Sequence, residues 1–290
     1  DNPQQVALLG EALKTIEQWQ ERVVEPNIAI RRVIGDAKSM NDLAREIGKA
    51  EGKVYFDRFR GQIATFIGRE ETLMKERQAN AKTADTKRAE AQKQIAETTK
   101  WVDHTGKVIA QAKDIIAAAV NMETGARGFM LSGKDVFLEP YNAGKADFTT
   151  LIASLQKTVD DNPAQVALLE EAKTTIANWQ AQVIEPQFEL RRKVAQGAKD
   201  VTMKTVADEI AKAKGKTFFD AFRKQIATFI SREAKLIAER KQKAVEAESE
   251  RANAQKLIAQ TTKWVDHTQN VIQTANAIIS AAVNMETGAR

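Results

Sequence analysis

The stretch from Glu123 to Phe129 contains the residues whose types and spacing best fit a binding site. Glu123 and Arg127 are four positions apart, so on a helix they lie on one face and can form an ion pair. Gly125 and Gly128 would let another helix approach closely. One interpretation is a tight contact between helices that a polar pair fixes. The other is a small polar pocket lined by Arg127.

Other polar residues could complete such a pocket. Glu139 and Tyr141 would face Arg127 across the turn that follows it. Arg191 and Arg192 could bind an acidic ligand as a bidentate clamp, or they could be solvated charges near a helix end. The ligand-binding candidates are therefore Glu123, Arg127, Glu139, Tyr141, Arg191 and Arg192.

Residues that support catalysis or metal binding are scarce. Cysteine is absent, and the two histidines, His104 and His267, occupy equivalent places in a repeated motif. Asp103 and His104 could be metal ligands, but adjacent helical positions point about 100° apart and do not converge. An ordinary polar histidine is the alternative. We expect no nucleophilic triad, no metal, no cofactor and no enzymatic activity.

The elements that would position these residues read as helices. Glycine and proline are sparse, and Ala, Lys, Glu and Gln are abundant. Asn2 and Pro3 are a helix start, and Pro26 should bend its helix. One continuous helix is predicted from Lys53 to about Met130, and at about 1.5 Å per residue it would exceed about 100 Å. After a turn at 131–134, a second helix is predicted over 135–159.

A long internal repeat divides the chain. Trp19 recurs as Trp179, and Trp101 recurs as Trp264. These tryptophans either pack at bundle ends or stack on a ligand. The expected parts are the second half of a first repeat (1–77), a polar helical connector (78–97), a complete four-helix repeat (98–240), a second polar connector (241–260) and the first helix of a third repeat (261–290).

Each predicted helix has one apolar stripe, which must be buried against another helix. Short connections make neighbouring helices antiparallel. The predicted fold is therefore all-α: elongated up-down four-helix bundles in tandem, joined by long continuous helices. The half repeats at the two ends would need helices from another chain, or from another repeat, to cover their apolar faces.

Charge and hydropathy limit the partners. The net charge is +5, and cations are mixed with carboxylates along most segments, which is typical of solvated helical faces. No basic patch with interleaved aromatic residues suggests nucleic-acid binding. No apolar run reaches the roughly 18 to 20 residues of a membrane span. We expect contact with a membrane only through flanking segments.

Several motifs carry a family resemblance. They are 101–105, 123–133 and 137–141, with motif positions Trp101, His104, Thr124, Gly125, Gly128 and Gly133. These residues resemble the CHASE-type extracytoplasmic sensor domain, third type, over 98–240 and in both partial copies. The resemblance implies a non-enzymatic four-helix sensory module of bacterial chemoreceptors and sensor histidine kinases. In that family a membrane span usually follows the position of Arg77 or Arg240, whereas here a polar helix follows.

The resemblance leads to two functional hypotheses. The first is the extracytoplasmic sensory region of a bacterial transmembrane receptor, a methyl-accepting chemotaxis protein above all, that passes a signal through long helices. The second is a structural spacer, stalk or filament protein of the cell envelope. Both place the chain on the periplasmic or extracellular side of an inner membrane. Both imply a homodimer or higher homo-oligomer formed through helix packing, and the first adds a small-molecule or protein ligand.

Overall fold

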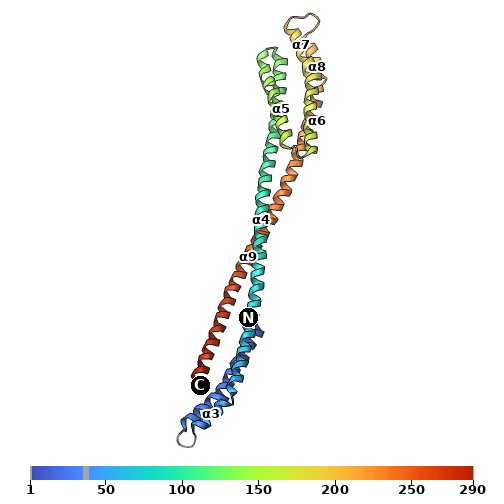
Figure 1. The fold of residues 1–290 in the computed structure, drawn as a ribbon. Coiled ribbons are helices and arrows are strands. Elements are labelled where there is room, and N and C mark those ends of the chain that lie inside the picture. The colour runs from blue at the N-terminus through green and yellow to red at the C-terminus, as the bar shows by residue number, and fades with distance from the viewer. Residues whose placement is uncertain (1, 35–38, 290) are drawn as a thin grey trace. The chain divides into compact units, whose positions relative to one another are not determined.

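The computed structural model of the chain describes residues 2–34 and 39–289, and within these ranges it contains helices and no strand. The predicted all-α fold is confirmed. Figure 1 shows the fold and labels several of its helices. The elements are α1 (Pro3–Trp19), η1 (Gln20–Val24), α2 (Glu25–Arg32), α3 (Met40–Gly48), α4 (Glu51–Ser132), η2 (Asp135–Leu138), α5 (Glu139–Thr158), α6 (Pro163–Trp179), η3 (Gln180–Ile184), α7 (Glu185–Ala195), α8 (Met203–Ala211) and α9 (Lys214–Ala289).

The chain forms two compact units. Unit 1 contains residues 1–91 and 249–290, and unit 2 contains residues 92–248. Position 290, the last of the predicted third-repeat helix, lies outside the described residues. The long helices α4 and α9 each contribute one part to each unit.

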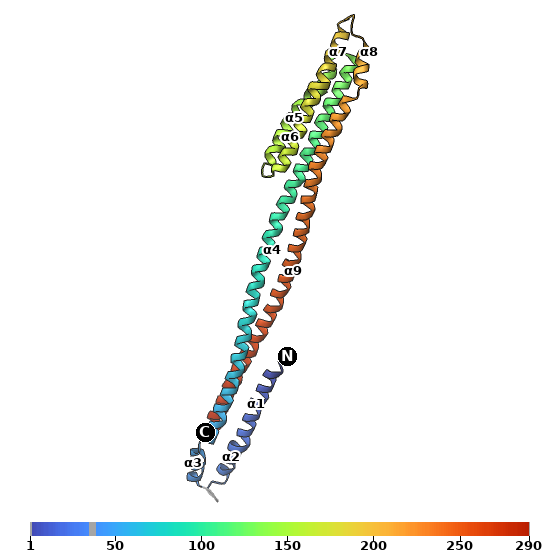
Figure 2. The same cartoon turned by 90° about the vertical axis from the view of Figure 1, so that its right-hand side faces the viewer.

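Unit 2 is a bundle of four long helical segments. Parts of α4 and α9 pack with α5 and with the run α6–η3–α7, and Figure 2 shows these elements gathered together with the short helix α8. Its core includes the fully buried side chains Ile115, Met122, Ile152, Leu169 and Phe222.

Unit 1 is assembled from both ends of the chain. Its core joins Trp19 of α1 and Phe56 of α4 to Ala275 and Ala282 near the end of α9. In Figure 1 these parts are the blue helices and the red end of α9. The half repeats therefore cover part of each other's apolar faces within one chain, although no helix described in unit 1 corresponds to α5.

Local sequence explains where α1 and α6 begin. The Asn2 side chain accepts a hydrogen bond from the backbone N–H of Gln4 at 3.1 Å, and Pro3 occupies the first turn. The Asn162 side chain caps α6 in the same way, accepting from the N–H of Gln165 at 3.3 Å. The predicted helix start at Asn2 and Pro3 is confirmed.

Proline produces the same irregularity in both copies. Pro26 has no backbone N–H, and its ring conflicts with the carbonyl four residues earlier. The preceding turn, Gln20–Val24, widens into a π-helix in which the N–H of Glu25 donates to the carbonyl of Gln20. The segment Gln180–Ile184 does the same before Pro186. The predicted distortion at Pro26 thus takes the form of a π-turn.

Two glycines allow α4 and α5 to approach closely in unit 2. A Cβ added to Gly144 would lie 2.7 Å from the carbonyl oxygen of Ala118 and 2.9 Å from the backbone nitrogen of Met122. A Cβ added to Gly125 would collide with the backbone nitrogen of Tyr141. The close helix contact predicted at Gly125 is present.

We predict that Gly144→Ala destabilises unit 2 by about 1–3 kcal/mol, because the added methyl group meets rigid backbone atoms. Chemical denaturation followed by circular dichroism measures the change. Gly106→Ala is the matched control: Gly106 is exposed on α4 with no atom within 4 Å of an added Cβ. That change should stabilise the helix by roughly 0.5–1 kcal/mol. Equal effects of the two substitutions would contradict the close approach.

Candidate functional site

A pocket in unit 2 lies beside Trp179. It is a pocket of about 620 Å³ between the face of α4 that carries Glu123 and Arg127, the π-turn η3, and the junction of α8 with α9. Ala213 and Lys216 line it at that junction. The pocket therefore collects side chains from each long segment of the unit except α5.

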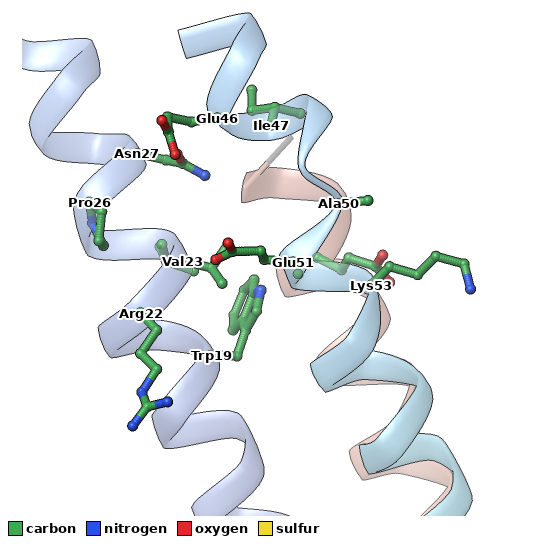
Figure 3. A pocket seen from close by; sticks show the side chains of 13 residues that line it. Trp19, Arg22, Val23, Pro26, Asn27, Glu46, Ile47, Ala50, Glu51 and Lys53 are labelled. Atoms are coloured by element: carbon green, nitrogen blue, oxygen red, sulfur yellow. The ribbon is translucent and has the colours of Figure 1, made fainter. Parts of the chain in front are cut away.

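Unit 1 has a pocket at the equivalent place, with a volume of about 340 Å³. Trp19, Ala50 and Lys53 take the positions of Trp179, Ala213 and Lys216. Figure 3 shows Trp19 and Glu51 between the helix that carries Val23 and the helix that follows Ala50, while Lys53 points away. The repeat thus carries its pocket twice.

An aromatic frame forms the inner wall of each pocket. Trp179 is buried and meets Phe219 edge to face, with ring centroids 4.9 Å apart. Trp19 and Phe56 repeat this pair at 4.9 Å. These contacts support the packing interpretation for this pair of tryptophans, while their edges still line the cavities.

The charged residues of the pocket in unit 2 are paired. Glu123 accepts a hydrogen bond from Arg127 and lies 3.7 Å from Arg223, and Lys216 pairs with Asp220. In unit 1 the equivalent of the Glu123–Arg223 pair is Glu286–Arg60, with 2.7 Å between the charged groups. Arg127 is 73% exposed, so its ion pair contributes little to stability. The predicted pair of Glu123 and Arg127 therefore forms at the pocket entrance.

Glu139 and Tyr141 lie elsewhere. Glu139 is exposed, and it does not line the pocket. Tyr141 is buried in the core, its ring 5.2 Å from that of Phe188, and its hydroxyl oxygen accepts a hydrogen bond from Gln180 at 3.3 Å. Burial raises the pKa of the Tyr141 hydroxyl above its ordinary value. The structure does not bring Glu139 or Tyr141 into one pocket with Arg127.

Arg191 and Arg192 take different roles. Arg191 is buried, and its Nε donates a hydrogen bond to the carbonyl oxygen of Met130 at 2.9 Å. This bond gives a partner to one of the last carbonyl groups of α4, which have none within the helix. A Cβ on Gly133, whose φ is +69°, would collide with this guanidinium. Arg192 lies over the rings of Phe129 and Phe188 at 5.8 and 5.9 Å. Neither arginine lines the pocket.

The residues around Trp101 form a contact between α4 and α9, and they do not line the pocket. Arg240 lies 5.0 Å above the ring of Trp101 and donates to the hydroxyl of Thr105. His104 meets the same ring edge to face at 5.5 Å. Arg77 repeats these contacts with Trp264 and Thr268 in unit 1. Trp101 is 46% exposed under this cation.

The other motif positions lie near the α4–α5 turn. Thr124 is exposed on α4. A Cβ on Gly128 would lie 3.0 Å from the ring of Phe137 in η2, so this glycine lets the turn fold against the helix.

The structure adds groups that the sequence analysis did not single out. Ala213 adopts φ +52° and Ala50 adopts φ +53°, each immediately before the start of a long helix at the pocket wall. Gln165 is buried, and its side-chain N–H donates to Glu233 at 2.6 Å. Gln5 repeats this bond to Glu70 at 2.7 Å. Exact recurrence in both copies was the available signal for both features.

We predict that Ala213→Gly stabilises unit 2 by about 1 kcal/mol, because a residue with a Cβ is strained in the left-handed region. Chemical denaturation measures the change. Ala207→Gly, at an exposed position in the middle of α8, is the control and should cost up to about 1 kcal/mol. A loss of stability in both variants would argue against strain at Ala213.

The raised pKa of Tyr141 predicts a pH effect on stability. A group whose pKa is higher in the folded state stabilises the fold below its unfolded pKa, near 10, and this contribution is lost as pH rises further. Wild-type unfolding free energy should therefore fall more steeply as the pH rises above about 10 than that of Tyr141→Phe. Urea titrations at several pH values test this, and equal slopes for the wild type and Tyr141→Phe would contradict it.

Among the helices that the structure describes, none is both long and apolar enough to cross a membrane.

Comparisons with known proteins place the chain in a family. No curated protein and no solved structure matches the chain. One family profile, described as the CHASE3 domain, matches residues 1–80 and 98–243, which is more than half of the chain. The chain therefore belongs to the CHASE3 domain family.

Proposed function

We propose that this chain is the sensory region of a methyl-accepting chemotaxis protein, located on the periplasmic side of a bacterial inner membrane. CHASE3 is an extracellular sensory domain of receptors and histidine kinases, which supports a sensory role. The proposal includes a homodimer or higher homo-oligomer formed through helix packing, and no enzymatic activity.

The repeated pocket is the observation that carries this proposal. Both units have a pocket at the equivalent place, between the π-turn, the left-handed alanine and the long helix that follows this alanine. A concave site of this size with an apolar wall and a few polar groups suits a small molecule. Packing alone does not require a hollow at this place in both copies.

The lining of the pocket in unit 2 indicates a class of ligand. Three cations, Arg127, Lys216 and Arg223, face two carboxylates, Glu123 and Asp220. Trp179 and Phe219 supply an aromatic wall behind them. We propose a small organic anion with an apolar part, whose carboxylate pairs with an arginine at the entrance and whose apolar part lies against the rings.

Such a ligand has a physical route to a signal. It would contact α4, η3 and the start of α9 together, so it would favour one packing of these elements over another. Both long helices extend far beyond the pocket in sequence. A small shift at their pocket ends is the kind of change that packed helices convert into a second discrete arrangement.

We predict that some small aromatic or branched carboxylates raise the melting temperature of the purified chain, whereas the matching neutral amides do not. A ligand at about 100 times its Kd adds about 2.7 kcal/mol, or several degrees. Arg223→Ala should reduce the shift. Arg232→Ala is the control, because Arg232 does not line the pocket. A shift that both variants retain would remove the pocket from the proposal.

The same ligand then tests the output. The chain is placed between the membrane spans of a chemoreceptor with its own cytoplasmic signalling domain, and swimming bias is recorded. Addition of the ligand should change the bias, and Arg223→Ala should require a higher concentration. Absence of any stabilising carboxylate, together with an unresponsive chimera, would favour a structural spacer of the cell envelope.

A further inference from the structure

Unit 1 exposes an apolar face that is buried in unit 2. The equivalent positions differ sharply in exposed fraction: Leu9 (37%) against Leu169 (0%), Ile278 (41%) against Ile115 (0%), Met285 (43%) against Met122 (0%), and Ile28 (38%) against Phe188 (2%). We name Leu9, Ile28, Ile278 and Met285 the open face. It combines residues from α1, α2 and the end of α9, which lie in the same unit.

The open face is a local feature and does not reflect looser packing of unit 1 as a whole. Phe56, Ile63 and Phe66 are as deeply buried there as their counterparts are in unit 2. Val283 is 37% exposed, and its counterpart Val120 is 38% exposed. The loss of burial is therefore not uniform across the unit.

Helix α5 explains this difference. In unit 2 it buries one stripe of side chains, comprising Tyr141, Gly144, Phe148, Ile152 and Leu155. This stripe belongs to the same core as Ile115, Met122 and Leu169. Gly144 lies against the backbone of α4 at Ala118 and Met122. Within the part of unit 1 that the structure describes, no helix takes this place.

The surface that α5 meets in unit 2 is chemically repeated in unit 1. Ala281 stands at the position of Ala118, so the small side chain that admits Gly144 is kept. The run 284–287 has the same residues as 121–124. One helix pattern, with a glycine at the closest contact and large apolar residues at helical spacing around it, thus fits both surfaces.

We propose that the open face of unit 1 is a docking site for one amphipathic helix of the α5 type, supplied by a further copy of this repeat. The incoming helix completes a four-helix bundle and buries the four residues of the open face. The site recognises a partner by its glycine as well as by its apolar stripe, because a side chain at the glycine position meets the backbone of α9. This goes beyond the sensory proposal and does not depend on the pocket.

The test is binding of a synthetic peptide to the full chain. The peptide spans residues 134–160 and carries a fluorophore, and binding is followed by fluorescence anisotropy. We expect saturable binding with a gain of helicity in circular dichroism, since an isolated helix of this length is marginal in water. A peptide with Gly144→Leu should bind at least about tenfold more weakly.

Two chain variants locate the site. Ile278→Asp should weaken binding at least about tenfold, because the incoming helix would bury a carboxylate on the open face. Val283→Asp should leave binding unchanged, since that position is exposed in both units. Both residues are solvent-accessible in the wild type, and circular dichroism of the free variants verifies that they fold.

Several results would overturn the proposal. Equal binding of the wild-type and Gly144→Leu peptides would show that no close backbone contact forms. Equal binding to the wild type and Ile278→Asp would place the peptide elsewhere. If Ile278→Asp abolishes self-association of the chain and the peptide does not compete for it, a second copy of unit 1 covers the face instead. None of these results bears on ligand binding at the pocket.

Discussion

The structure depends on small buried side chains that recur every seven residues along the two long helices. On α4 they are Ala84, Ala91, Thr98, Thr105, Ala112, Ala119 and Ala126, and on α9 they are Ala247, Ala254, Thr261, Thr268, Ala275 and Ala282. A seven-residue repeat keeps one seam of a helix facing its partners. Small residues on that seam let backbones approach without a large apolar core. This explains how segments as polar as 78–97 and 241–260 stay helical and still bury a stripe.

The two units share most of their structural features, but one helix of unit 2 has no counterpart among the described residues of unit 1. Both units have the capped entry helix, the proline-driven π-turn, the Trp–Phe pair, the glutamine–glutamate bond and the arginine stacked on a tryptophan. Unit 1 lacks a counterpart of α5 among its described residues, and several of its apolar positions are exposed although their counterparts share a core with α5. Each unit therefore serves as a control for the other, which a chain without repeats could not offer.

Local signals in the sequence predicted the helices well. Asn2 and Pro3 start a helix by capping chemistry, and the long proline-free run forms α4 as Glu51–Ser132. Contacts between distant segments were harder to predict. Nothing local indicates that the two ends of the chain share one unit, because that pairing depends on which apolar stripes meet in space. Tyr141 and Arg191 looked like pocket residues, yet burial turned the first toward the core and the second toward a helix end. The spacing of large apolar residues also does not reveal the buried stripe on the long helices, because that stripe consists of alanine and threonine.

The pocket lies beside two departures from regular α-helix. A π-turn forms one wall, and an alanine in the left-handed region precedes the helix that forms another. Strain of this kind is kept only when the surrounding packing holds it in place, and it concentrates at functional sites. The proposed sensory role needs two packings of these elements, and a ligand shifts the balance between them only by the difference in its affinity for each. Both copies therefore place the π-turn and the left-handed alanine beside the cavity from which, in the proposed function, a signal would start.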